Sequence, residues 1–254
     1  MDLETHLKSI RKSGRPILVP YITGGITNDW MHLVEELAHL GADAIEIGIP
    51  FSDPMIDGPV IQEASNLALQ RGATTESILL ELAQLNLEIP LVAMTYYNLV
   101  LRADPTRFAN WCHEGGVSGT IIPDLPPEEM RPLETALDKE SIVNVLLIAP
   151  STTDERLKFI AGKSKGFLYT IGVMGTTGER TDLAESATIL AKRAKQVTDL
   201  PVLVGIGISN EIQAQEVTKV ADGVVIGSAF MRRILEDQSG KSALKFFSSL
   251  RSAL

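Results

Sequence analysis

The chain has 254 residues, of which 44% are hydrophobic, and a formal net charge of −9. This length and composition allow a large folded core, whereas the negative charge argues against a surface for nucleic acid or for an anionic membrane. No hydrophobic run approaches the roughly 20 residues that a membrane-spanning helix needs, and the N-terminus lacks a signal-peptide core. We therefore expect a cytoplasmic protein. The single cysteine, Cys112, excludes an internal disulfide and fits a reducing compartment.

Eight short apolar runs recur along the chain and predict eight strands. They cover residues 17–22, 44–49, 90–96, 119–124, 142–149, 167–171, 202–207 and 223–227. Helical patterns lie between them and begin at recognisable caps: Asp104 before a proline, Thr152 three residues before a glutamate, and Asn210 three residues before a glutamine.

The alternation of strands and helices predicts the fold class. Strands that are apolar throughout are buried on both faces, as in a parallel sheet that helices cover. Eight strand–helix units in this length predict a (β/α)8 TIM barrel, with residues 1–254 forming a single domain. Residues 2–12 predict an extra N-terminal helix that closes the bottom of the barrel. A doubly wound sheet is the alternative, but it usually has fewer strands and a nucleotide-binding fingerprint.

A glutamate lies in the middle of the second apolar run. Side chains alternate along a strand, so Ala44, Glu46 and Gly48 share one face and the two isoleucines between them share the other. The isoleucines suit the helix layer, which turns Glu46 into the barrel. None of the eight runs contains a lysine or an arginine, so burial should raise the pKa of Glu46 and suit it to acid–base catalysis near neutral pH.

The same distribution of residues excludes two other mechanisms. A Schiff-base aldolase needs a lysine on a strand that faces the substrate, and no run provides one. A metal aldolase needs ligands that converge at the barrel mouth, but the four histidines fall in helical patterns. We therefore expect no metal site and no strand lysine in catalysis.

A stiff acidic loop follows the second run. Three prolines fix backbone angles between Pro50 and Pro59, and the loop contains Asp53 and Asp57. Either aspartate, taken alone, is more typical of a turn or a helix cap than of a functional site. Next to an inward glutamate, two carboxyl groups from one strand and loop can address two atoms of one substrate.

Glycines end the last two runs. Gly205 and Gly207 end the seventh run, and Gly227 ends the eighth and is followed by Ser228, in each case just before a helix. Glycines let an anion approach backbone amides, and helix N-termini attract anions. Loops seven and eight of such barrels are the frequent phosphate site, so we expect a phosphate there. The glycine- and threonine-rich residues 172–182 are typical of a mobile lid.

The residues I-E-I-G-I-P-F-S-D-P-M-I-D-G, at 45–58, closely resemble the signature of the alpha subunit of tryptophan synthase. Supporting matches to this family lie at 20–25, 94–98, 123–129, 166–169, 205–208 and 226–229. The resemblance implies retro-aldol cleavage of indole-3-glycerol phosphate to indole and glyceraldehyde 3-phosphate without a cofactor in this chain. One departure lies at residues 175–178, where G-T-T-G replaces the family's usual G-V-T-G.

The resemblance also implies residue roles by position. Glu46 would protonate the indole ring carbon and help to deprotonate the glycerol hydroxyl, and Asp57 would accept the indole N–H and stabilise the protonated ring. Residues that would line the indole pocket or support the closed site are Tyr21, Met94, Tyr96, Ile121, Tyr169 and Thr177. Residues whose amides would hold the phosphate are Gly178, Gly207, Gly227 and Ser228.

The partner that the resemblance implies is the beta subunit, which binds pyridoxal phosphate and would join this chain in an alpha2-beta2 heterotetramer. Two alternatives stay open. The chain could act mainly as a binding and activating subunit of negligible turnover, or it could be another phosphate-binding barrel, such as the indole-glycerol-phosphate synthase or phosphoribosylanthranilate isomerase type. The synthase type would need a strand lysine, which is missing.

Overall fold

All eight predicted strands are present in the computed structural model, which describes the backbone of residues 1–171, 180–205 and 207–254 and their side chains outside 180–186. They pair in parallel and in chain order, and the last strand pairs with the first, so the barrel is closed. The strands are β1 (Ile17–Thr23), β2 (Ile45–Gly48), β3 (Leu91–Met94), β4 (Val117–Ile121), β5 (Val143–Ile148), β6 (Leu168–Thr170), β7 (Val202–Val204) and β8 (Gly223–Ile226).

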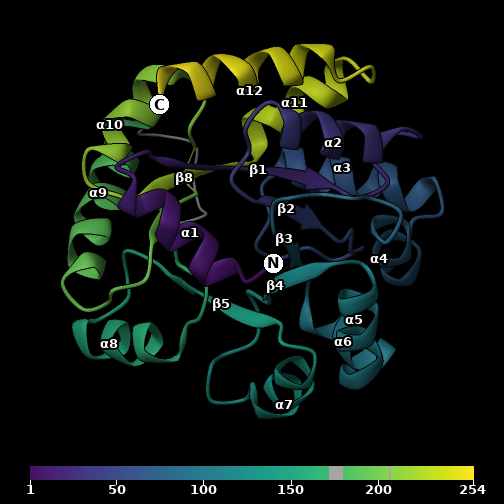
Figure 1. Cartoon of the computed structure of the whole chain (residues 1–254), viewed down its shortest axis with the longest axis horizontal. Helices are drawn as coiled ribbons and strands as arrows, with labels where there is room; N and C mark the ends of the chain where they lie inside the picture. The colour runs from purple at the N-terminus through teal and green to yellow at the C-terminus, as the bar shows by residue number, and fades with distance from the viewer. Residues whose placement is uncertain (172–179, 206) are drawn as a thin grey trace.

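Helices surround the barrel (Figure 1), and none in the described part of the chain is long and apolar enough to cross a membrane. They are α1 (Leu3–Lys12), α2 (Trp30–His39), α3 (Pro59–Gln70), α4 (Thr75–Leu82), α5 (Tyr97–Ala103), α6 (Pro105–Glu114), α7 (Arg131–Lys139), α8 (Asp154–Lys163), α9 (Arg180–Lys195), α10 (Glu211–Thr218), α11 (Ser228–Glu236) and α12 (Lys241–Ala253). The predicted barrel class is confirmed. Residues 180–182, predicted to be loop, belong to α9.

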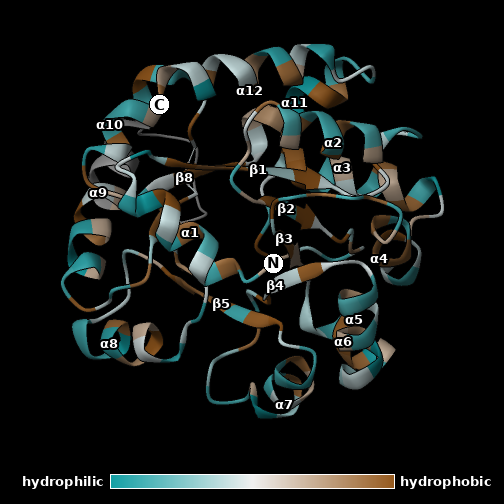
Figure 2. Ribbon diagram, in the orientation of Figure 1, coloured by the Kyte–Doolittle hydropathy of each residue, from teal (hydrophilic) through white to brown (hydrophobic). Residues whose placement is uncertain are grey.

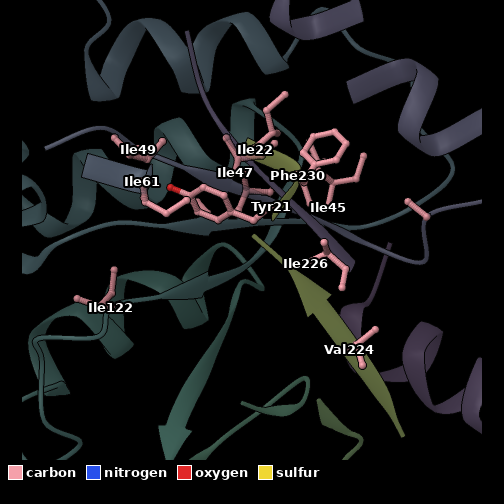
Figure 3. Close-up of a cluster of buried hydrophobic side chains, with 14 of the residues drawn as sticks. Tyr21, Ile22, Ile45, Ile47, Ile49, Ile61, Ile122, Val224, Ile226 and Phe230 are labelled. Atoms are coloured by element: carbon pink, nitrogen blue, oxygen red, sulfur yellow. The ribbon is translucent and has the colours of Figure 1, made fainter. Parts of the chain in front are cut away.

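The outer core lies between the strands and the helices. It contains Ile22, Ile45 and Ile47 from the strands and Phe230 from α11, all of them fully buried (Figure 3). Figure 2 shows the matching pattern, with hydrophobic residues along the strands and hydrophilic residues on the outward surfaces of the helices. Burial on this scale is the main favourable term in the folding of such a barrel.

The inner core fills the barrel itself and continues into α1. Strand residues such as Val19, Ala44 and Val92 pack with Leu3 and Leu7 of the helix. The N–H of Gly166, just before β6, donates to Glu4 of α1 at 3.0 Å. Helix α1 therefore closes the N-terminal end of the barrel, as predicted, and leaves the C-terminal end for the site.

Two of the three predicted helix caps are confirmed. Asp104 caps α6 and Asn210 caps α10. The prediction of Thr152 is wrong by one residue, because Thr153 caps α8. The hydroxyl of Thr152 instead accepts a bond from the N–H of Ala149 at 3.0 Å and so serves the turn after β5.

Candidate active site

Glu46 lies inside the barrel, as its strand parity predicts. Ala44, two residues earlier, belongs to the inner core, whereas Ile45 and Ile47 belong to the outer core. The side chain of Glu46 is 1% exposed. Parallel pairing places it between Tyr21 of β1 and Val92 of β3.

The surroundings of Glu46 favour its protonated form. Burial, followed by the charge of Asp57, raises the pKa of Glu46 to about 8 against the opposing effect of a hydrogen bond with Tyr169. Its Oε2 atom is buried without a hydrogen-bond partner among the described residues, and no lysine or arginine of that part of the chain forms an ion pair with it. A buried acid without a cation holds its proton at neutral pH.

Asp57 lies at the rim of the barrel, on the loop between β2 and α3. The hydroxyl of Tyr96 donates to its Oδ2 at 3.0 Å and accepts from the N–H of Ile56 at 3.1 Å. The ring of Phe51 packs against Tyr96 with 5.2 Å between centroids, which fixes the loop on the end of β3. Burial raises the pKa of Asp57 to about 6, against the opposing effect of the Tyr96 bond.

Asp53 occupies a different position on the same loop. Its side chain is exposed, and its Oδ2 accepts from the hydroxyl of Ser52 at 2.5 Å. Of the two loop aspartates, it is Asp57 whose charge acts on Glu46. The loop therefore gives its two carboxyl groups separate environments.

Two tyrosines flank Glu46 by lying over glycines of the next strand. A Cβ atom added to Gly48 would lie 1.9 Å from the hydroxyl of Tyr21, and one added to Gly205 would lie 2.3 Å from the ring of Tyr169. Both glycines are thus needed to make room for the rings. The sequence alone did not predict this role, because Gly205 was grouped with the phosphate-binding glycines. The signal for it was Gly48, which shares the inner face of its strand with Glu46 and so leaves space beside that side chain.

The remaining site residues fall in three groups. Met94 and Ile121, which are neighbours in the β3–β4 register, end their strands at the inner side of the barrel. Gly207 follows β7 with a φ of 50°, and Gly227 and Ser228 form the N-terminus of α11. A Cβ atom on Gly227 would lie 3.8 Å from that of Tyr21, which brings the end of β8 beside the same tyrosine.

Two predicted residues, Thr177 and Gly178, lie outside the described residues, together with most of the expected lid. Within the described part, no group of three or more histidine, cysteine, aspartate or glutamate side chains could hold a metal ion. The chemistry that these residues can perform is proton transfer by two carboxyl groups with different proton affinities.

The family model and the most similar curated proteins agree on one family. The tryptophan synthase alpha chain family model matches residues 7–250. The tryptophan synthase alpha chain of Dehalococcoides mccartyi is 40% identical over 94% of this chain and 96% of its own length, and that of Oceanobacillus iheyensis is 42% identical over 91% and 89%.

Solved structures agree in fold and in family. Tryptophan synthase subunit alpha of Legionella pneumophila superposes with a TM-score of 0.90 at 31% identity, covering 100% of this chain and 98% of that one. A tryptophan synthase structure from Mycobacterium tuberculosis gives 0.89 at 33%, covering 99% and 97%. In members of this family the alpha chain is a lyase that cleaves indole-3-glycerol phosphate to indole and glyceraldehyde 3-phosphate, and it is the beta subunit that binds pyridoxal phosphate. The chain therefore belongs to the tryptophan synthase alpha chain family.

Proposed function

We propose that Glu46 carries the proton transfers of this lyase reaction and that Asp57 stabilises the charge they create. The protonated Glu46 gives its proton to the indole carbon that bears the glycerol chain. The ring becomes cationic, and the carboxylate of Asp57 accepts a hydrogen bond from its N–H. Glu46, now ionised, takes the proton of the adjacent glycerol hydroxyl as the carbon–carbon bond breaks.

These steps balance without a further reactant. One proton reaches the ring carbon and one leaves the hydroxyl, so Glu46 returns to its protonated form after each turnover. The electrons of the broken bond return to the ring and restore indole, and the glycerol carbon becomes the aldehyde of glyceraldehyde 3-phosphate. The cycle starts from a neutral Glu46 and an ionised Asp57, which their pKa values of about 8 and about 6 favour at pH 7.

The observation that carries this assignment is that Glu46 is buried with no lysine or arginine of the described residues paired to it. An ion pair would hold the carboxylate ionised and remove the proton that the ring must receive. The Oε2 atom, which has no hydrogen-bond partner among the described residues, supports the same role, because a group that exchanges protons with a substrate needs an oxygen that is open to it.

Substrate positioning is proposed for the surrounding residues. Tyr21, Met94, Tyr96 and Ile121 line the indole pocket, and Tyr169 holds Glu46. The backbone around Gly207, Gly227 and Ser228 holds the phosphate, with Thr177 and Gly178 completing the site. The N-terminus of α11 supports the phosphate assignment, because free N–H groups and the helix dipole favour an anion there.

The test is indole release from indole-3-glycerol phosphate by the full chain, with and without an added beta subunit. Glu46→Gln should fold normally and lower the chemical step by at least about 10²-fold. Asp57→Asn should cause a large loss, and Asp53→Asn, the matched control on the same loop, a milder one. Full turnover by Glu46→Gln would refute the assignment, and equal losses at the two aspartates would refute the choice of Asp57.

We infer that the working assembly is an alpha2-beta2 heterotetramer in the cytoplasm, in which residues 1–254 act as one domain. Met55, on the loop that carries Asp57, is 91% exposed and is therefore accessible to a partner. An activating subunit without its own turnover would release no indole alone or with the beta subunit. The raised pKa of Glu46 favours the enzyme.

A further inference from the structure

The loop after β4 holds the first residue of α5 through a carboxyl group. The N–H of Tyr97 donates to both carboxylate oxygens of Asp124, at 2.9 and 3.1 Å, although the two residues are 27 positions apart in the chain. In α1, α6 and α10 the capping side chain instead belongs to the residue directly before the helix. The start of α5 is thus tied to the next strand unit of the barrel.

The backbone of this loop is held on both sides of Asp124. Pro123, just before it, has a fixed backbone angle. The N–H of Leu125, just after it, donates to the carbonyl of Ile122 at 3.2 Å, and the Leu125 side chain is buried in the outer core. Asp124 can therefore orient the peptide group that it binds.

Two contacts with β4 and its loop hold the backbone of Tyr96. The N–H of Thr95, the residue before it, donates to the carbonyl of Ile121 at the end of β4, at 3.0 Å. The N–H of Tyr97, the residue after it, donates to Asp124. The first anchor is a backbone carbonyl and the second is a side chain, so a substitution can remove the second alone.

Tyr96 passes this restraint to the loop after β2. Its hydroxyl donates to Oδ2 of Asp57 at 3.0 Å and accepts from the N–H of Ile56 at 3.1 Å. A tyrosine side chain has only two rotatable angles, so the place of its backbone decides where its hydroxyl lies. The strands β2, β3 and β4 are neighbours in the barrel (Figure 1), and a chain of direct contacts runs across them from Asp124 through Tyr96 to Asp57.

We propose that Asp124 is a positioning residue for the lyase reaction, which fixes the backbone of Tyr96 and so keeps the Tyr96 hydroxyl on the carboxylate of Asp57. This inference rests on the role proposed above for Asp57. A donor to a carboxylate stabilises its ionised form, and a misplaced group at the site lowers the rate even when the change lies far from the chemistry. Asparagine keeps a side-chain oxygen that can accept the Tyr97 N–H, whereas alanine has none.

The test compares Asp124→Ala and Asp124→Asn with wild type in indole release by the full chain. We expect Asp124→Ala to lower kcat/KM about 3- to 10-fold at pH 7, the effect of weakening one hydrogen bond. Asp124→Asn should stay within about twofold of wild type, because asparagine caps a helix about as well as aspartate does. The acidic limb of the pH profile should move up in Asp124→Ala, because the bond from Tyr96 lowers the pKa of Asp57 and is weakened in this variant.

The matched control is Asp2→Ala. Asp2 also accepts an N–H at the start of a helix, from Thr5 at 2.7 Å, but it does so on α1 at the opposite end of the barrel. This variant should leave both kcat/KM and the acidic limb unchanged. A moved limb in Asp2→Ala would show that the loss of any helix cap has this effect, and would overturn the proposal.

A double-mutant cycle with Tyr96→Phe separates positioning from general destabilisation. In that background Asp124→Ala should change the remaining rate by less than about twofold, because the hydroxyl that it positions is gone. An unmoved limb, an equal loss in both backgrounds, or an equal loss in Asp124→Asn and Asp124→Ala would overturn the role of Asp124 and leave that of Asp57 intact. Full activity of Asp57→Asn alone would overturn the role of Asp57 itself.

Discussion

Replacing Glu46 with glutamine should remove a pH-dependent loss of stability along with the activity. The pKa of Glu46 rises from an ordinary 4.5 to about 8 in the folded chain. Between these values the folded state keeps the proton and the unfolded state releases it, so the free energy of unfolding falls as the pH rises. The slope is about 1.4 kcal/mol per pH unit, which amounts to about 5 kcal/mol over the whole interval.

Glutamine cannot ionise, so the variant lacks this slope. Urea unfolding of wild type and Glu46→Gln at several pH values from 4 to about 9 would measure the difference. We expect the variant to gain stability relative to wild type up to about pH 8, with no further change above it. The exposed Glu63→Gln on α3 is the matched control and should show no comparable trend. A difference that stays constant with pH would mean that Glu46 is ionised in the folded chain, which would refute the acid–base role.

Three further results should follow from the structure. The pH profile of kcat/KM should be bell-shaped, rising near pH 6 as Asp57 ionises and falling near pH 8 as Glu46 loses its proton; a flat profile across this range would contradict both assignments. Gly48→Ala should lower the free energy of unfolding by roughly 1–3 kcal/mol and reduce indole release, because its Cβ would lie 1.9 Å from the hydroxyl of Tyr21. An unchanged melting temperature would contradict this, because it would show that the tyrosine ring can move aside freely. Arg251→Met should lower the free energy of unfolding by about 2 kcal/mol, since Arg251 joins α12 to the buried Asp43 at 3.1 Å, and equal urea midpoints would contradict this.

Local sequence information was enough to predict the strands and to predict that the side chain of Glu46 points into the barrel. Side-chain parity is a property of a single strand, and the apolar isoleucines on either side of Glu46 determine which face is inward. The carboxylate of Asp57 could be assigned only through the family resemblance, because an aspartate before a glycine is ordinary in any turn. The environments of Asp57 and Asp53 differ because Tyr96, which lies just after β3, bonds to Asp57.

Contacts between segments that are distant in the chain could not be predicted from the sequence. Gly205 resembles a phosphate-binding glycine in the sequence, yet its lack of a Cβ makes room for Tyr169 of the neighbouring strand. The ion pairs of Asp43 with Arg15 and Arg251 were missed for the same reason. Such contacts depend on strand register and on helix placement across the barrel, which no local pattern encodes.

The two carboxyl groups need different environments for the reaction to run near neutral pH. If both had ordinary pKa values, Glu46 would lack a proton for the ring carbon; if both were as buried as Glu46, Asp57 would be neutral and could not stabilise the cationic ring. Placing one inside the barrel and the other on a rim loop, where Tyr96 donates to it, separates their pKa values to about 8 and about 6. The stiff loop after β2 thus contributes to catalysis by holding Asp57 at an intermediate depth, where its charge also helps Glu46 to keep its proton.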